Sequence, residues 1–92
     1  VIIEESARSF QLTGADLRGQ SRSKKTAMAR QIAMYLMRNL TNLPLKEIGE
    51  EFGGRNHATV LSSIRKVEAL LKSDPEIAAT VRDITSNINS KN

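Results

Sequence analysis

Residues 44–72 read PLKEIGEEFGGRNHATVLSSIRKVEALLK, and this stretch decides the fold. Pro44 is tolerated in the first turn of a helix, and Gly53-Gly54 ends that helix after about nine residues. Apolar residues recur at spacings of three and four, as they do on one face of a helix. The predicted inner faces are Leu45, Ile48 and Phe52 in the first helix, and Val60, Ile64, Val67 and Leu71 in the second. Two helices joined by a glycine turn have the layout of a helix-turn-helix, which ordinary helical hairpins share.

The sequence on either side of this stretch predicts further helices. Thr13-Gly14-Ala15-Asp16 matches a capping box that opens a short helical turn ending at Gly19. A long helix is predicted from about Thr26 to Leu40, and Asp74-Pro75-Glu76 is a strong start for a last helix over 75–89. An N-terminal helix and the last helix have the apolar spacing of Ile3, Ala7 and Phe10, and of Ile77, Val81, Ile84 and Ile88. No window alternates as a strand does, so we predict an all-α fold, a compact bundle of about six helices in one domain over 1–92.

Length and composition exclude several classes of protein. The 92 residues fit one small domain, with 14 Lys and Arg against 10 Asp and Glu and a formal net charge of +4. The absence of Cys excludes a disulfide framework, a Cys-based zinc site and a thiol nucleophile. The longest apolar stretch, Ile32 to Met37, is too short to form a transmembrane segment, for which about 20 residues are needed. No secretory signal is visible, so we expect a cytoplasmic location.

The positive charge is concentrated in one part of the chain. Between Asp16 and Glu47 there is no acidic residue, and the basic residues there are Arg18, Arg22, Lys24, Lys25, Arg30, Arg38 and Lys46. Such a run makes a local field that attracts a polyanion, although a merely solvated surface has the same composition. Gly and Ser residues predict an exposed basic loop at about 19–25, within this run. The segment has no apolar face, which argues against docking on a membrane surface.

The second helix of the 44–72 stretch begins with Arg55-Asn56-His57-Ala58-Thr59. These residue types read base edges or hold phosphates, and the free amides of a helix N-terminus favour anions. His57 is the only histidine, and it lacks the partners that a metal site or a nucleophilic triad requires. We therefore expect no metal and no enzymatic activity in this chain, and a helix-turn-helix whose second helix enters the major groove of DNA.

The segment Gly53-Gly54-Arg55-Asn56-His57-Ala58-Thr59-Val60 resembles the signature of the DnaA family of bacterial replication initiators, usually Gly-Gly-Arg-Asp-His-Thr-Thr-Val. Further matches are Ala29-Arg30-Gln31-Ile32-Ala33-Met34-Tyr35-Leu36, Leu40-Thr41 and Glu47-Ile48-Gly49. The resemblance spans essentially the whole chain. It implies the C-terminal DNA-binding domain of such an initiator, with a Trp-repressor-like helical layout. The chain departs from the usual signature at Asn56, where the family has aspartate, and at Ala58, where it has threonine.

The resemblance also implies roles for individual residues on double-stranded DNA. It implies binding to a short asymmetric DnaA box of the TTATNCACA type, with Arg22 in the minor groove. The implied base contacts are Arg22, Asn56, His57, Ala58 and Thr59. The implied contacts to the DNA backbone are Lys24, Lys25, Arg30, Gln31, Arg38, Leu45, Lys46, Arg55 and Lys66. Arg30 and Gln31 are expected on the exposed side of the long helix, and the departures at Asn56 and Ala58 predict relaxed discrimination under the first turn of the recognition helix.

Partners and cofactors follow from the same resemblance. ATP is expected only in the full-length parent, because no Gly-rich phosphate loop occurs in this chain. The isolated domain is expected to be a monomer at the nucleoid, with other initiator copies and regulators bound through upstream domains. Two alternatives stay open: a Trp-repressor-type transcription regulator, which is a symmetric dimer on a palindrome, and a protein-interaction module. The latter uses the last helix or the acidic residues Glu47, Glu50 and Glu51.

Overall fold

The computed structural model describes residues 1–90 and contains six helices within them. They are α1 (Ile2–Ser9), α2 (Gly14–Arg18), α3 (Lys24–Leu40), α4 (Leu45–Glu51), α5 (His57–Ser73) and α6 (Pro75–Ser90). The described residues include no strand, which confirms the predicted all-α fold of about six helices. Residues 91 and 92 of the predicted domain lie outside the described residues. No helix in residues 1–90 is long and apolar enough to cross a membrane.

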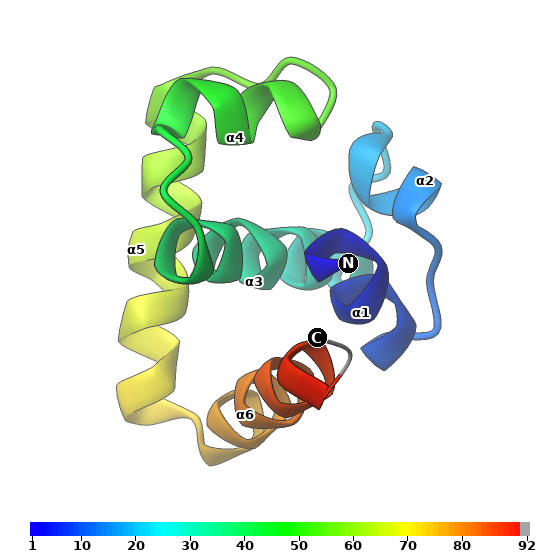
Figure 1. Cartoon of the computed structure of the whole chain (residues 1–92), viewed down its shortest axis with the longest axis vertical. Coiled ribbons are helices and arrows are strands. Elements are labelled where there is room, and N and C mark those ends of the chain that lie inside the picture. The colour runs from blue at the N-terminus through cyan, green and yellow to red at the C-terminus, as the bar shows by residue number, and fades with distance from the viewer. Residues whose placement is uncertain (91–92) are drawn as a thin grey trace.

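Helix α3 is the centre of the bundle (Figure 1). It packs against α1, α2, α4 and α5, and it buries apolar residues over more than one face, as an enclosed helix must. Helix α5 runs along one side of the molecule, with α4 at its beginning and α6 at its end (Figure 1). Helix α6 packs against both α1 and α5. Helix α4 and the turn between α4 and α5 therefore lie at the opposite end of the bundle from α6 (Figure 1).

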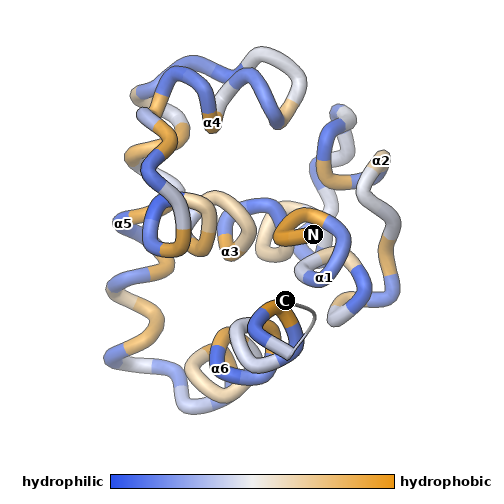
Figure 2. Tube along the Cα trace, in the orientation of Figure 1, coloured by the Kyte–Doolittle hydropathy of each residue, from blue (hydrophilic) through white to orange (hydrophobic). Residues whose placement is uncertain are grey.

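The core consists of two clusters of buried side chains. The first, which we call the upper cluster, joins residues of α1 to α5, with Leu17, Met34, Ile48 and Phe52 fully buried. The second, the lower cluster, consists of Ile32, Leu36, Val67, Val81, Ile84 and Ile88. Hydrophobic and hydrophilic residues alternate along α5 and α6, as expected for helices with one buried face (Figure 2). The predicted inner faces are confirmed, although Phe10, Leu45, Leu71 and Ile77 are only half-buried, and Phe10 follows the last residue of α1.

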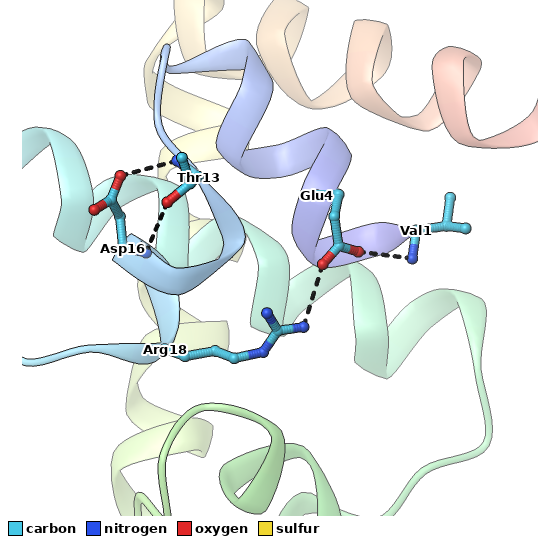
Figure 3. Close-up of polar contacts among 5 residues, drawn as sticks. All are labelled: Val1, Glu4, Thr13, Asp16 and Arg18. Carbon is cyan, nitrogen blue, oxygen red and sulfur yellow. Dashed lines mark hydrogen bonds and ion pairs between the residues drawn. The ribbon is translucent and has the colours of Figure 1, made fainter.

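The predicted capping box fixes the start of α2. The Thr13 amide donates to Asp16 Oδ2 at 2.9 Å, and the Asp16 amide donates to Thr13 Oγ1 at 3.2 Å (Figure 3). At the other end of this short helix, Arg18 Nη2 forms an ion pair of 3.2 Å with Glu4 Oε2 of α1 (Figure 3). Helix α2 is thus held at both ends, directly before the basic loop.

Several boundaries differ from the sequence-based expectation by one or two residues. Helix α3 begins at Lys24 rather than Thr26, because the Ser23 hydroxyl accepts a hydrogen bond of 3.1 Å from the Thr26 amide and caps the helix. Lys24 and Lys25 consequently belong to α3, and the basic loop is 19–23 instead of 19–25. Pro44 is the N-cap residue of α4, with an extended ψ of 160°, and does not lie in its first turn.

The predicted start of α6 is confirmed. Asp74 Oδ1 accepts hydrogen bonds from the Glu76 and Ile77 amides at 3.0 and 3.3 Å, directly before Pro75. The helix then continues to Ser90, one residue beyond the predicted end.

Candidate nucleic-acid interface

The turn between α4 and α5 depends on three glycines. Gly53 and Gly54 have φ values of 78° and 85°, in the left-handed region that glycine adopts without strain. The Gly49 carbonyl oxygen accepts hydrogen bonds from the amides of Phe52, Gly54 and Arg55, at 3.1, 3.1 and 3.0 Å. A β-carbon on Gly49 would lie 1.9 Å from the Arg55 carbonyl oxygen, so that position requires glycine. The predicted glycine turn at Gly53-Gly54 is confirmed.

The first turn of α5 presents the predicted base-reading side chains to solvent. Asn56, His57, Ala58 and Thr59 are all exposed. Asn56 is the N-cap residue, and its Oδ1 accepts a hydrogen bond of 2.9 Å from the Thr59 amide. This bond also fixes the orientation of the amide group, because the nitrogen of the side chain cannot accept from a backbone N–H. The Asn56 side chain therefore directs its Nδ2 donor group outward.

A surface pocket lies between α4, the α4–α5 turn and the start of α5, and we call it the turn pocket. It is lined by Lys46, Glu50, Gly54, Arg55, Asn56 and His57. Two predicted base contacts thus share one concave surface with Lys46, a predicted backbone contact. Glu50 lines the same pocket, and its presence there was not predicted.

A second surface pocket, the α3 pocket, is lined by residues of the basic loop, α3 and α5. These are Arg22, Lys24, Ala27, Met28, Gln31 and Lys66. The fold therefore brings together four predicted DNA contacts that are up to 44 positions apart in the sequence, Arg22 and Lys66 being the most distant pair. Gln31 is half-buried, and its Oε1 is buried without a hydrogen-bond partner in the described chain, whereas Arg22 and Lys24 are exposed.

The expected exposure of Arg30 is wrong. Its side chain is only 8 % exposed, because α2 and the basic loop fold back over the start of α3. Its Nε donates to the Leu17 carbonyl oxygen at 2.8 Å, and its Nη2 donates to those of Gly19 and Ser21 at 3.3 and 3.2 Å. Burial, and secondly the positive charge of Arg55, lower the pKa of Arg30. Its contact with DNA stays a prediction, whereas its contacts with the loop are observed.

Arg55 has a similar arrangement on the other side of the loop. Its side chain is half-buried, and Nη1 donates to the Phe52 carbonyl oxygen within the α4–α5 turn. Nη2 donates to the Gly19 carbonyl oxygen at 2.7 Å, across 36 positions of sequence. Much of the hydrogen-bonding capacity of this guanidinium is therefore used within the protein.

The remaining predicted contacts lie outside these two pockets. Lys25 is exposed in the first turn of α3, and Leu45 is half-buried at the first position of α4. Arg38 is exposed in the last turn of α3, where its Nη1 donates to the Leu43 carbonyl oxygen at 3.4 Å. Their roles on DNA stay predictions, and among them Lys25 lies beside Lys24 of the α3 pocket.

The carbonyl oxygens of Leu17, Gly19 and Ser21 are the functional groups that sequence reasoning missed. Every residue carries such an oxygen, so residue types do not show which three accept hydrogen bonds from the two arginines. The alternative of a protein-interaction surface has its own geometry, since Glu47, Glu50 and Glu51 line a further pocket with Leu43. Within residues 1–90, no group of His, Cys, Asp or Glu side chains could hold a metal ion.

Comparison with known proteins identifies the family. Residues 1–67 match the family model described as the bacterial dnaA protein helix-turn-helix. The chain is 51% identical over 87 residues to the chromosomal replication initiator protein DnaA of Leifsonia xyli, covering 95% of this chain and 18% of that protein. It is 46% identical over 90 residues to that of Lactiplantibacillus plantarum, covering 98% and 20%. The chain thus spans about a fifth of the length of these relatives. It belongs to the bacterial DnaA family, as the C-terminal helix-turn-helix domain of that family.

Proposed function

We propose that this domain binds double-stranded DNA at DnaA-box-type sites, similar to TTATNCACA, in a replication origin. In this proposal α5 enters the major groove with its first turn, and Arg22 enters the adjacent minor groove. The observation that carries it is the exposure of the whole segment from Asn56 to Thr59 at the N-terminus of the second helix of a helix-turn-helix. A helix start that is left uncovered in this way offers both side chains and free amides to a nucleic acid.

The charges of the two pockets support a polyanionic ligand. Among the charged residues of their linings, five are basic, namely Arg22, Lys24, Lys46, Arg55 and Lys66. One carboxylate, that of Glu50, lies among them. Each pocket includes one residue of α5, His57 in its first turn and Lys66 in its middle. A narrow, AT-rich minor groove has an enhanced negative potential, which suits the exposed guanidinium of Arg22.

The role in a larger protein follows from the named relatives. Those relatives are called chromosomal replication initiator proteins, and this chain corresponds to about a fifth of their length. We infer that the domain directs a replication initiator to its origin in the bacterial cytoplasm, at the nucleoid. On this proposal the domain itself is not an enzyme and needs no cofactor. ATP and the contacts with other initiator copies and regulators belong to the rest of such a protein.

A binding selection on random duplex DNA tests this proposal. The expected result is one asymmetric site related to the DnaA box, bound by one domain per site. Recovery of a palindrome bound by two copies would instead support the Trp-repressor-type regulator. Capture of a protein partner that DNA competitor leaves unchanged, without any selected DNA site, would support the protein-interaction module and contradict the proposal. Its surface would then be the acidic pocket of Glu47, Glu50 and Glu51.

A further inference from the structure

Two arginines, one from α3 and one from the α4–α5 turn, meet at one backbone oxygen, the carbonyl of Gly19. Arg55 Nη2 lies 2.7 Å from this oxygen, and Arg30 Nη2 lies 3.3 Å from it. We propose that this Gly19 junction is a positioning device: Arg30 and Arg55 set the place of the basic loop, and so of Arg22, relative to the first turn of α5. The inference rests on the proposed function, because its purpose is to align two groups that contact DNA.

Each guanidinium bridges two parts of the chain. Arg30 begins from α3 and also reaches Leu17 at the end of α2 and Ser21 in the loop, at 2.8 and 3.2 Å. Arg55 begins from the α4–α5 turn and also reaches Phe52 in that turn. These contacts require a planar group with several donors in fixed directions, which arginine has and lysine lacks. The junction therefore depends on the shape of the two side chains as well as on their charge.

The backbone makes a second, independent connection between the same two segments. A β-carbon on Gly53 would lie 2.7 Å from the Arg18 carbonyl oxygen, so the α4–α5 turn packs directly against the end of α2. Arg18 is followed at once by Gly19, whose carbonyl is the shared acceptor. Residues 18–19 and 53–55 are thus joined at two points. A loop that is fixed at its first residue has less freedom to lose when Arg22 enters a groove.

The cost of this arrangement indicates that its geometry is needed. Two like charges converge on one acceptor, and in residues 1–90 neither Arg30 nor Arg55 has a carboxylate as an ion-pair partner. Arg30 is moreover taken out of water. Burying a cation without a counter-charge is unfavourable for stability. An approaching phosphate supplies the missing negative charge, so the free energy of this junction improves when DNA is bound.

Arg55→Lys is the sharpest test, because it keeps the charge and removes the fork. Affinity for the selected site is measured for the wild type, Arg22→Ala, Arg55→Lys and the double variant. We expect the loss of affinity caused by Arg22→Ala to be about threefold to tenfold smaller in the Arg55→Lys background than in the wild type. The reason is that a displaced loop no longer places Arg22 in the minor groove. Arg82→Lys, an exposed position of α6, is the matched control and should leave the effect of Arg22→Ala unchanged. Equal effects in both backgrounds would overturn the proposal.

A second measurement uses only the DNA-free wild type and does not depend on any variant folding. Backbone amide order parameters of residues 19–22 should be near those of the helices, about 0.85. Values below about 0.6 in the wild type show a flexible loop and contradict the junction. The two ideas can fail separately. An ordered loop in a protein that selects no DNA would contradict the proposed function and leave the junction standing.

Discussion

The two ends of α5 are held in different ways. At its start, glycines with positive φ, the triple acceptor at the Gly49 carbonyl and the two arginines on Gly19 fix the neighbouring segments by directional polar contacts. At its end, the Asp74 cap makes only local hydrogen bonds to the first turn of α6, and the lower cluster of six aliphatic residues packs α5 against α6 and α3. Directional contacts specify positions to within a fraction of an ångström, whereas aliphatic burial tolerates adjustment. The end of α5 that presents the predicted DNA contacts is therefore the end where substitutions should be tolerated least.

The largest expected effect is that of salt concentration, which should weaken DNA binding far more than it changes folding stability. Six of the predicted DNA contacts are exposed cations: Arg22, Lys24, Lys25, Arg38, Lys46 and Lys66. If these six cations together neutralise about six phosphate charges, log K should fall with log salt at a slope of about −5, or about a thousandfold in affinity between 50 and 200 mM salt. The free energy of unfolding, which depends on burial, should change little over that range. A slope near zero in a titration series would remove the DNA proposal.

Gly49→Ala should destabilise the turn at the start of α5. The new methyl group would collide with the Arg55 carbonyl oxygen, a backbone atom that cannot move without opening the turn. We expect a loss of about 3 kcal/mol in the free energy of unfolding, measured by urea denaturation. Gly54→Ala is the matched control: its β-carbon meets open space, so only the strain of its positive φ remains, about 1 kcal/mol. Equal losses for the two variants would show that the close approach at Gly49 is unimportant.

Ile84→Ala tests the packing at the end of α5, where the lower cluster lies. Ile84 is fully buried in the lower cluster, and its truncation leaves a cavity, which should cost about 2 to 3 kcal/mol in the free energy of unfolding. DNA affinity per folded molecule should nevertheless stay within about twofold, because no residue of α6 lines either basic pocket. Ser86→Ala, at an exposed position of the same helix, should change neither quantity. A large loss of affinity at a temperature where Ile84→Ala is folded would show that the two ends are coupled.

Arg22→Ala tests which DNA group is contacted by the basic loop, near the start of α5. We expect a loss of about 2 kcal/mol in binding free energy on a box with an AT-rich flank, and a much smaller loss when that flank is G·C. Arg82→Ala removes the same charge from α6 and serves as the control. If Arg22→Ala weakens binding to both flanks equally, Arg22 contacts phosphate rather than the minor groove.

The smallest effect concerns base preference. Asn56 Oδ1 caps α5 through the Thr59 amide and leaves the Nδ2 donor outward, whereas an aspartate would cap with one oxygen and present a second acceptor. Asn56→Asp should therefore favour a base that offers an amino group, cytosine above all, by about 1 kcal/mol. A panel of single-base box variants measures this, with Asn87→Asp in α6 as a control for the added charge. Identical profiles for Asn56→Asp and the wild type would mean that Asn56 serves only as a cap.

The helices were predictable from the sequence because their signals are local. The spacing of Val60, Ile64 and Val67 and the capping residues Thr13 and Asp74 act within one or two turns, and the structure confirms all of them. The exposed first turn of α5 was predictable for the same reason. Arg30 was misplaced because its environment comes from α2 and the basic loop, which fold over it. No local pattern encodes which carbonyl oxygens a buried guanidinium will meet.

The N-cap of α5 has a consequence for how such domains diverge. The Asn56 side chain has two separate polar atoms there. Oδ1 caps the helix, and Nδ2 is the other atom, which is available to a ligand. Residue types with a capping oxygen, such as Asn, Asp, Ser and Thr, can exchange at this position while the helix start is maintained. Under the proposed function each exchange alters the outward group, and with it the preferred base. Recognition can therefore drift by single substitutions at this position without an intermediate that fails to fold.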